Sequence, residues 1–457
     1  MSTLPDKMRA VLIKDGVGPS SSLYIGEAPT PSVEGDDAAE QVLVKVKAFG
    51  LNRMDLLQRE GKYPIPPGAS KILGVEFSGT VAALGKQVQG LELGNEVFGL
   101  ATGGAYAEYV RIPARMLLRK SQQMDWVQAA SVPEAFLTAY QALKVLNTMK
   151  EGEDVLIHAG ASGVGLAAIQ LARAFGARRV YVTAGSDEKI AFCKSLGADD
   201  GFNYKTGDWS EALAKATNKQ GVDVILDFIG APYFTPNIKS LKLDGRLSMQ
   251  GFMGGNVAEK VNLGTLLTKR LRVEGSTLRS RSLEYQSKLV QEFFHSGGLD
   301  TIERGASSSE SNADGLAHRL VVHKVFDWHN IKDAHDEMAA NKSTSHCGGG
   351  CMLTMTDIGK SRLLLERTGA TLTRSHGHHF VAAPGAPCER PSMHLAYIQI
   401  HIVRSKRRLG RLGVLQLWPR HLGTFILAAL EARGVLVADG LHHLVEAVQR
   451  IAECVQR

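Results

Sequence analysis

Cysteine is scarce in this 457-residue chain, and none precedes Cys193. The five cysteines are an odd number without framework spacing, which excludes a disulfide-stapled secreted domain and fits a reducing compartment. No apolar run is long enough to span a bilayer. The start, MSTLPDKMRAVLIKDG, lacks the charged-then-apolar pattern of a secretory signal. We therefore expect a cytoplasmic protein with no membrane partner.

Basic charge is concentrated at the end of the chain. Residues 357–457 contain 12 Arg, 2 Lys and 7 acidic residues, whereas residues 1–356 contain 39 residues of each sign. Eight of the 15 histidines also lie in residues 357–457. The whole chain is 44% hydrophobic and 22% charged, which is ordinary for a globular protein. The sequence therefore divides into a globular part and a basic, His-rich tail.

A glycine-rich loop, HAGASGVGLAAIQ (158–170), lies between two predicted strands. DVLI (154–157) is a short apolar run typical of a buried parallel strand, and VYVT (180–183) is the second strand. Good helix formers separate them, and Gly176 is suited to ending that helix because glycine tolerates a positive φ. This is a βαβ unit of the size that binds dinucleotides.

The loop carries Ser162 where the G-x-G-x-x-G fingerprint has its middle glycine. We expect Gly160 to make the turn, Gly163 and Val164 to lead into the helix, and Gly165 to let the helix pack closely on the strand. Ser162 is small enough to fit and can add a hydroxyl donor. The free N–H groups at the helix N-terminus would then bind a pyrophosphate. The alternative is a tight turn that holds no ligand.

The acidic residue that holds the ribose 2′-hydroxyl at NAD sites is missing here. The second strand ends in TAGS (183–186), and Lys189 follows one helical turn later. Its ammonium and Ser186 favour a 2′-phosphate, and therefore NADPH. Asp187 and Glu188 are interpreted as first-turn residues of the next helix, where the dipole favours acids. The alternative for Lys189 is a solvated surface lysine.

The arrangement of predicted elements indicates an α/β protein. Residues 8–115 are rich in strand patterns, and residues 130–150 predict a helix. Strands and helices then alternate over residues 154–274, with later strands in VDVILDFIG (222–230) and GRLSMQGF (245–252). This alternation predicts a doubly wound parallel sheet of the Rossmann type.

Several segments together resemble one family, the zeta-crystallin-like quinone oxidoreductases of the medium-chain dehydrogenase/reductase superfamily, over residues 8–342. The segments are LNRMDLLQREGKYPIPPGAS, LGVEFSG, EAFLTAYQAL, VLIHAGASGVGLAAIQLAR, TAGSDEKI, GFNYK, ILDFIG, LDGRLSMQGFMGG and AHDEMAANK. The resemblance implies a GroES-like β-barrel catalytic domain over residues 8–138, completed by residues 275–356, and a Rossmann domain over residues 139–274. It also implies NADPH between the two domains, and a homodimer.

The resemblance further implies where the cofactor is held. Gly185, Ser186, Lys189 and Tyr204 would surround the 2′-phosphate, while residues 228–230 and 252–255 would line the nicotinamide half. The expected contacts outside the glycine-rich loop are Thr138, Gly185, Ser186, Lys189, Tyr204, Phe252, Met253 and Gly254.

No metal is expected, although zinc alcohol dehydrogenases share this architecture. Asn52 and Val75 occupy two of their ligand positions; valine has no donor atom and a neutral amide is a poor zinc ligand. The four-cysteine structural lobe is missing as well, because no cysteine precedes Cys193. Without a Lewis acid, oxidation of a simple alcohol is disfavoured.

The expected reaction is hydride transfer from NADPH to an electron-poor quinone, with Asn52 and Tyr63 as candidate catalytic residues. Asn52 could donate a hydrogen bond to the substrate or to the nicotinamide amide. Tyr63 lies in the Gly/Pro-rich loop GKYPIPPGAS (61–70) and could supply a proton or act only as a lid. The alternatives are an NADPH-dependent 2-alkenal or enoyl reductase, and a non-enzymatic NADPH- and RNA-binding crystallin-like protein.

The segment after residue 342 departs from the family pattern. STSHCGGG intervenes before MLTMT (352–356), which could still supply the last strand. His346, Cys347 and Cys351 have a spacing too weak to predict a metal site. SKRRLGR (405–411) is more typical of a solvated linker than of a nucleic-acid-binding segment, so nucleic acid is not an expected partner.

The fold of residues 357–457 cannot be assigned from the sequence. Apolar residues from 441 to 455 have helical spacing, which would suit a terminal amphipathic helix. The alternatives are a disordered tail, or read-through or mis-spliced sequence that has no selected fold.

Overall fold

The computed structural model of the chain describes residues 4–259, 261–298, 320–340, 350–355, 370–371 and 401–402. The chain divides into two compact units, Met1–Thr356 and Asp357–Arg457. In the second unit the described residues form two short strands, β16 (Ala370–Thr371) and β17 (His401–Ile402), which pair antiparallel. The interpretations of residues 405–411 and 441–455, and of His346 and Cys347, lie outside the described residues.

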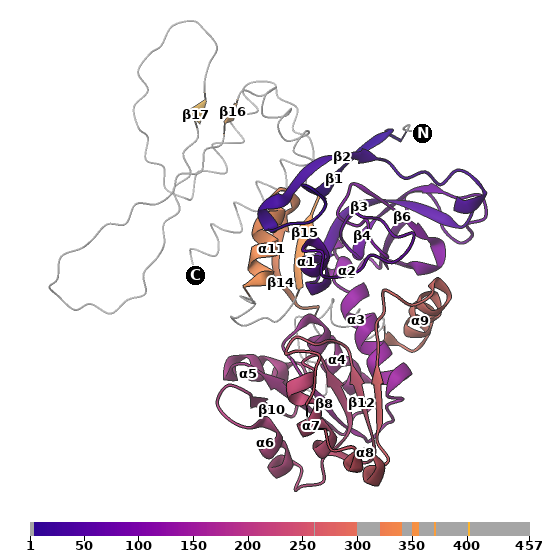
Figure 1. The fold of residues 1–457 in the computed structure, drawn as a ribbon. Coiled ribbons are helices and arrows are strands. Elements are labelled where there is room, and N and C mark those ends of the chain that lie inside the picture. Colours follow the sequence, from indigo (N-terminus) through magenta and orange to yellow (C-terminus); the bar gives the residue numbers. More distant parts are fainter. Residues whose placement is uncertain are drawn as a thin grey trace, which may run out of the picture. The chain divides into compact units, whose positions relative to one another are not determined.

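One part of the first unit is formed by the beginning and the end of its chain, and its strands pair mainly antiparallel (Figure 1). Two strands form one sheet: β1 (Lys7–Ile13) and β2 (Leu23–Pro29). A larger sheet has the order β14 (Val322–Asp327), β15 (Gly350–Thr354), β3 (Gln41–Leu51), β4 (Glu76–Leu84), β5 (Glu96–Leu100) and β7 (Leu117–Arg119), with β6 (Tyr109–Pro113) also paired to β3. The helices of this part are α1 (Arg53–Arg59), α2 (Trp126–Ala130), α3 (Pro133–Tyr140), α9 (Leu283–His295) and α11 (Ile331–Ala339).

The strand expected from MLTMT is present as β15, despite the intervening glycine-rich segment. β15 runs antiparallel to β3, with Leu353 opposite Phe49, and parallel to β14. The end of this unit therefore returns to the sheet that its beginning forms, as a GroES-like domain requires.

Six parallel strands form the third sheet of the same unit. Their order is β10 (Asp200–Asn203), β9 (Arg179–Ala184), β8 (Asp154–Ile157), β11 (Val222–Asp227), β12 (Leu241–Met249) and β13 (Arg272–Gly275). The helices between them are α4 (Gly163–Ala174), α5 (Asp187–Ser195), α6 (Trp209–Ala216), α7 (Ala231–Ser240) and α8 (Leu263–Lys269). This is the Rossmann strand order, so the predicted doubly wound sheet is confirmed.

Alternating side chains of these strands enter two separate hydrophobic clusters, because successive strand residues point to opposite faces. Val155 and Ile157 of β8 pack in the cluster that contains Leu166 of α4. Leu156, between them, packs in the cluster that contains Trp209 and Leu213 of α6. Helices therefore cover both faces of the sheet, which explains why the strands are continuous apolar runs in the sequence.

The helix predicted over residues 130–150 is interrupted. α2 ends at Ala130, and α3 begins at Pro133, which suits the first turn because proline has no N–H to leave unsatisfied. After Tyr140 the chain continues as a π-helix over Gln141–Leu146. Thr148 then takes a positive φ of 44°. The predicted helix therefore corresponds to α3 and the π-helix, and Pro133 sets its start.

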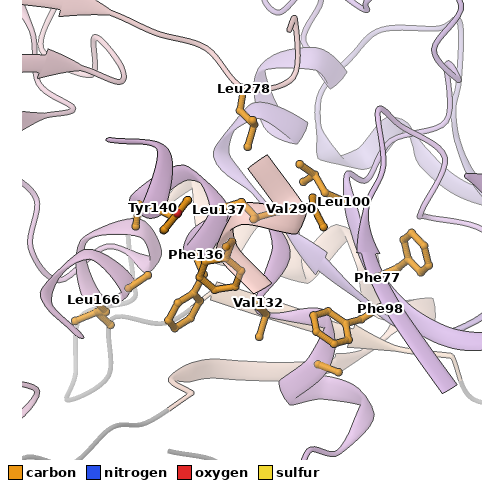
Figure 2. Packing of buried hydrophobic residues seen from close by; sticks show 14 of the residues in the cluster. Phe77, Phe98, Leu100, Val132, Phe136, Leu137, Tyr140, Leu166, Leu278 and Val290 are labelled. Atoms are coloured by element: carbon orange, nitrogen blue, oxygen red, sulfur yellow. The ribbon is translucent and has the colours of Figure 1, made fainter. Parts of the chain in front are cut away.

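The two larger sheets of the first unit share one hydrophobic cluster, which Figure 2 shows from close by. Phe77 of β4 and Phe98 of β5 come from the antiparallel part, Leu137 from α3, Leu166 from α4 and Val290 from α9. α3 packs against α4 and α9. α3 is therefore fixed between the antiparallel sheet and the glycine-rich loop. Within the part of the chain that the structure describes, no helix has the length and apolarity to cross a bilayer.

Candidate active site

The glycine-rich loop lies where the strand order of the parallel sheet reverses. β8 has β9 on one side and β11 on the other, and the chain leaves β8 toward β9 but returns to β11. In such sheets the crevice beyond the carboxyl ends of these two strands is where ligands bind. The segments that enter it are residues 158–162 after β8 and residues 228–230 after β11.

Ser162 is the N-cap of α4, and its Oγ accepts a 3.1 Å hydrogen bond from the N–H of Gly165. The hydroxyl proton remains available to a ligand, because this bond uses only a lone pair of the oxygen. The N–H groups of Gly163 and Val164 have no partner among the described residues. A Cβ at Gly163 would meet no atom within 4 Å, so space lies open above these donors. An anion fits this helix N-terminus.

The three glycines of the loop have different roles. A Cβ at Gly165 would lie 2.5 Å from the carbonyl oxygen of Ala159, so the helix approaches the turn too closely for a side chain. Gly160 lies in the turn, as expected, but the positive φ, 47°, falls on Ala159. Gly160 is needed for space instead, because its Cβ would lie 2.7 Å from Cβ of Val182.

Two buried polar atoms near this crevice have no hydrogen-bond partner among the described residues. They are Oγ1 of Thr138 on α3 and Nε2 of Gln250, directly after β12. A buried group without a partner is unfavourable by about 1–3 kcal/mol. Both atoms are therefore available to a dinucleotide, and Thr138 was expected in that role from the resemblance. Gln250 was missed, although its position at the carboxyl end of a predicted strand was a usable signal.

Gly185 and Tyr204 come together at the other end of the crevice. A Cβ at Gly185 would lie 2.7 Å from the hydroxyl oxygen of Tyr204 and 3.3 Å from Cε of Lys205. Tyr204 is 44% exposed, although it is aromatic. Ser186 caps α5 by accepting from the N–H of Lys189, and no carboxylate among the described residues pairs with Lys189 or Lys205. Lys205 is a second cation that was missed at this place.

The two acids beside Lys189 lie in the first turn of α5, as expected. Asp187 accepts a 2.9 Å hydrogen bond from Nδ2 of Asn203. Its carboxylate is thereby held against β10.

The two segments predicted to line the nicotinamide half lie against each other. Met253 N donates to the carbonyl of Phe228, and Gly254 N donates to that of Ile229. Phe252 is 53% exposed and Met253 59% exposed. Large apolar side chains that exposed are unusual, and they suit a surface that a planar ring covers.

A cluster of buried carboxyl groups lies around the start of α1. Asn52 precedes α1, and its Nδ2 donates a 2.7 Å hydrogen bond to Oε1 of Glu76. The other oxygen of Glu76 accepts from the N–H of Glu134. Asp55 accepts from the N–H groups of Asn52 and Gly74. Burial raises the pKa of Asp55 to about 6 and that of Glu76 to about 8.

Tyr63 lies beside this cluster. The guanidinium carbon of Arg279 is 5.7 Å from the centre of the Tyr63 ring, a cation–π contact. Burial, and then the negative charge of Glu134, raise the pKa of Tyr63. Burial beside Asp55 raises the pKa of Glu134 to about 7. A carboxyl group that titrates near neutrality beside a tyrosine can deliver protons.

α3 connects the carboxyl cluster with the dinucleotide crevice. Glu134 and Thr138 are four residues apart on α3, so their side chains project from the same face. Tyr63 and Asn52 were predicted for the site, whereas Glu76, Glu134 and Arg279 were not. Glu76 and Glu134 lie in LGVEFSG and EAFLTAYQAL, which carry the resemblance, but neither was given a role, and Arg279 lies in none of those segments.

Two family models match the chain: "Alcohol dehydrogenase GroES-like domain" over residues 38–122 and "Zinc-binding dehydrogenase" over residues 163–294. The chain is 30% identical to the quinone oxidoreductase of Lama guanicoe over 285 residues, which cover 62% of this chain and 84% of that protein. It is 37% identical to a phenolphthiocerol synthesis polyketide synthase of Mycobacterium marinum over 235 residues, which cover 51% of this chain but only 11% of that protein. The solved structure of the CurK enoyl reductase superposes with a TM-score of 0.63 at 26% identity, covering 77% of this chain and 100% of that one.

The chain therefore belongs to the zinc-independent, quinone oxidoreductase-like proteins of the medium-chain dehydrogenase/reductase superfamily. It is an oxidoreductase with a nicotinamide-dinucleotide-binding fold.

Proposed function

We propose that this protein reduces a quinone with NADPH. One observation carries the proposal: Glu134 and Thr138 lie on the same face of α3, one helical turn apart. Glu134 belongs to the carboxyl cluster, and the hydroxyl of Thr138 has no partner among the described residues. A dinucleotide on the crevice and an acceptor beside Tyr63 would then be neighbours. NADPH supplies the hydride when it is bound, and the side chains of the protein position the acceptor and supply protons.

The preference for NADPH rests on the charge around Gly185. Lys189 and Lys205 are cations without a carboxylate partner in the described part of the chain, and Tyr204 adds a hydroxyl. A 2′-phosphate would give both cations an anion to pair with. Ser162, Gly163 and Val164 would hold the pyrophosphate. Phe252, Met253 and Gly254 would contact the nicotinamide half.

A quinone is favoured as the acceptor because the guanaco relative is named for that activity. Quinone reduction needs only positioning and protons at oxygen. Asn52 uses one amide hydrogen on Glu76, and its second amide hydrogen can be donated to a carbonyl oxygen. Tyr63 can donate its phenolic proton, and Glu134 can replace that proton.

A second candidate is an NADPH-dependent 2-alkenal or enoyl reductase. The proton-delivering arrangement of Tyr63 and Glu134 favours it, because such a substrate needs a proton at carbon after the hydride. The likeness to the CurK enoyl reductase supports the same candidate.

The test is oxidation of NADPH by the full-length chain, with 1,2-naphthoquinone and with a 2-alkenal as acceptors and with NADH in parallel. Turnover of the quinone that is faster with NADPH than with NADH supports the proposal. Turnover of the alkenal alone supports the second candidate. Binding of NADPH without turnover of either acceptor leaves a non-enzymatic NADPH-binding protein.

We also propose a cytoplasmic homodimer, with the domain boundaries that the resemblance implies. Among the described strands β13 pairs only with β12, which leaves its other edge open. On the neighbouring α8, Leu263 is 67% exposed and Leu267 80% exposed. A second copy would cover this edge and these leucines. Sedimentation of the wild-type chain as a dimer and of L267E as a monomer is the expected result; a monomeric wild type contradicts it.

A further inference from the structure

Four fully buried polar side chains form a continuous hydrogen-bonded row beneath the crevice. Nδ1 of His158 is 2.9 Å from Oγ1 of Thr183, and its Nε2 is 2.7 Å from Oδ1 of Asn237. Nδ2 of Asn237 donates to Oδ2 of Asp227 over 3.2 Å. All four residues have no exposed surface. Thr183 lies on β9 and His158 directly follows β8, whereas Asn237 lies on α7 and Asp227 at the end of β11.

The bonds of the row allow one consistent assignment of donors and acceptors. Asp227 can only accept, so Asn237 must present its NH2 group to Asp227 and its oxygen to His158. Nε2 of His158 therefore carries the proton, and Nδ1 accepts from the hydroxyl of Thr183. His158 is thus neutral, and burial lowers its pKa to about 4. The edges of the Trp209 and Tyr233 rings enclose it, each centred 4.7 Å from the imidazole.

The carboxylate at one end of the row holds backbone rather than a ligand. Oδ1 of Asp227 accepts a 2.7 Å hydrogen bond from the N–H of Ile229, and the N–H of Gly230 bonds to the same carboxylate. Gly230 has a φ of +87°, and its Cβ would lie 2.6 Å from the carbonyl oxygen of Gly255. The loop of residues 228–230 is therefore fixed from below by Asp227 and from above by residues 252–255.

The other end of the row reaches the glycine-rich loop. The carbonyl of Thr183 accepts from the N–H of Gly160. A buried polar row is weak evidence for stability, because apolar side chains of the same volume often serve as well. What this row supplies is geometry, since it ties the ends of three strands and one loop that all face the crevice.

We propose that Asp227, Asn237 and His158 are positioning residues that fix the loop of residues 228–230 for the nicotinamide half of the cofactor. The inference rests on the proposed function, because it assumes that NADPH binds in this crevice. None of the three touches the cofactor. They act through the backbone N–H groups of Ile229 and Gly230.

The decisive variant is N237L, which keeps the volume, leaves Nε2–H of His158 without a partner and removes the side-chain donor to Oδ2 of Asp227. The full-length chain is titrated with NADPH and with 2′,5′-ADP, which carries the 2′-phosphate but no nicotinamide. The fluorescence of bound NADPH reports the surroundings of the nicotinamide ring. We expect N237L to weaken NADPH by about tenfold and to change this fluorescence, with 2′,5′-ADP unchanged within about twofold.

The matched control is N330L. Asn330 is exposed, and its side chain makes no capping hydrogen bond at the start of α11. N330L is therefore expected to bind both ligands like the wild type. If N237L does not fold, N237S replaces it, because it breaks the same bonds with a smaller side chain.

The inference is overturned if N237L binds NADPH as tightly as the wild type does and the bound NADPH has the same fluorescence. An equal loss of NADPH and 2′,5′-ADP would overturn it too, because the row would then support the whole sheet. Failure of the wild-type chain to bind 2′,5′-ADP would instead contradict the proposed cofactor. In that case the same comparison with 5′-ADP and NADH still decides whether the row positions the loop.

Discussion

Asn52 and Glu76 are joined by a 2.7 Å hydrogen bond from Nδ2 to Oε1. The second oxygen of the same carboxyl group accepts from the N–H of Glu134, at the start of α3. One buried acid therefore positions both a candidate catalytic residue and the helix that carries Thr138. Gly50 must be glycine beside it, because a Cβ there would lie 2.0 Å from Oε1 of Glu76.

Replacing Glu76 by glutamine should change the pH dependence of stability. Burial raises the pKa of Glu76 to about 8 from its usual 4.5, so the folded state holds this proton more tightly than the unfolded state. Its contribution is therefore complete below pH 4.5 and is lost as the pH rises toward 8. Relative to E76Q, the wild type should lose at most about 1.4 kcal/mol of unfolding free energy per pH unit in that window. The measurement is chemical denaturation of both proteins at pH 5 and at pH 8. The same difference in unfolding free energy between the wild type and E76Q at both pH values would contradict this.

The parallel sheet could be predicted from the sequence because its signals are local. DVLI is a short apolar run, the glycine-rich loop follows it directly, and Gly176 ends the helix with a φ of +78°. The role of Gly165 also followed from local packing. The turn conformation of Ala159 could not be predicted, because alanine rarely takes a positive φ and nothing in the sequence marks it.

The carboxyl cluster could not be predicted for a different reason. Asp55, Glu76 and Glu134 come from three separate segments that precede the parallel sheet, and Arg279 joins them only because the chain returns from that sheet to the antiparallel one. In the sequence each looks like an ordinary charged residue. Their burial, and the resulting shifts in pKa, exist only in the folded chain.

Reversing the charge of Lys189 or Lys205 should change the preference between the two nicotinamide cofactors. We expect K189E and K205E each to lower kcat/KM for NADPH by about tenfold, or about 1.4 kcal/mol, and to leave NADH unchanged or slightly improved. The matched control is K150E, an exposed lysine before the amino end of β8 and thus at the opposite edge of the sheet. An equal loss with both cofactors would show that the 2′-phosphate is not bound there.

Removing the hydroxyl of Tyr63 should separate the two candidate substrates. Y63F keeps the aromatic ring that the guanidinium of Arg279 contacts, but it removes the phenolic proton. Reduction of a 2-alkenal, which needs a proton at carbon, should slow by about a hundredfold. Reduction of a quinone should change much less, because the oxygens of the reduced quinone can take protons from water when Tyr63 supplies none. The measurement is kcat with each acceptor at saturating NADPH. Unchanged alkenal turnover would leave Tyr63 with a lid role only.

Glu134 should determine how the alkenal reaction depends on pH. Burial beside Asp55 raises its pKa to about 7, so it is protonated below that pH and can pass a proton toward Tyr63. The wild-type kcat should therefore fall as the pH rises through 7, by up to about tenfold per pH unit above it. E134Q cannot titrate, so its kcat should be lower and level across this range. The same fall in E134Q would assign the titration to another group.

Two glycines of the same loop should fail in different ways when each is changed to alanine. At Gly165 a Cβ would lie 2.5 Å from the carbonyl oxygen of Ala159, and backbone must move to admit it. G165A should therefore lower the unfolding free energy by about 1–3 kcal/mol. At Gly163 a Cβ would meet nothing within 4 Å, and alanine favours the helix, so G163A should be as stable as the wild type or up to about 1 kcal/mol more stable.

The affinity for NADPH should fall in G163A, although G163A is the variant that keeps its stability. The methyl group of G163A would occupy the open space above the N–H groups of Gly163 and Val164, where the pyrophosphate is proposed to bind. G163A should then bind NADPH about tenfold more weakly while its melting temperature is unchanged. Thermal unfolding and NADPH titration of both variants decide the matter. If G163A binds NADPH like the wild type, the pyrophosphate does not lie on the N-terminus of α4.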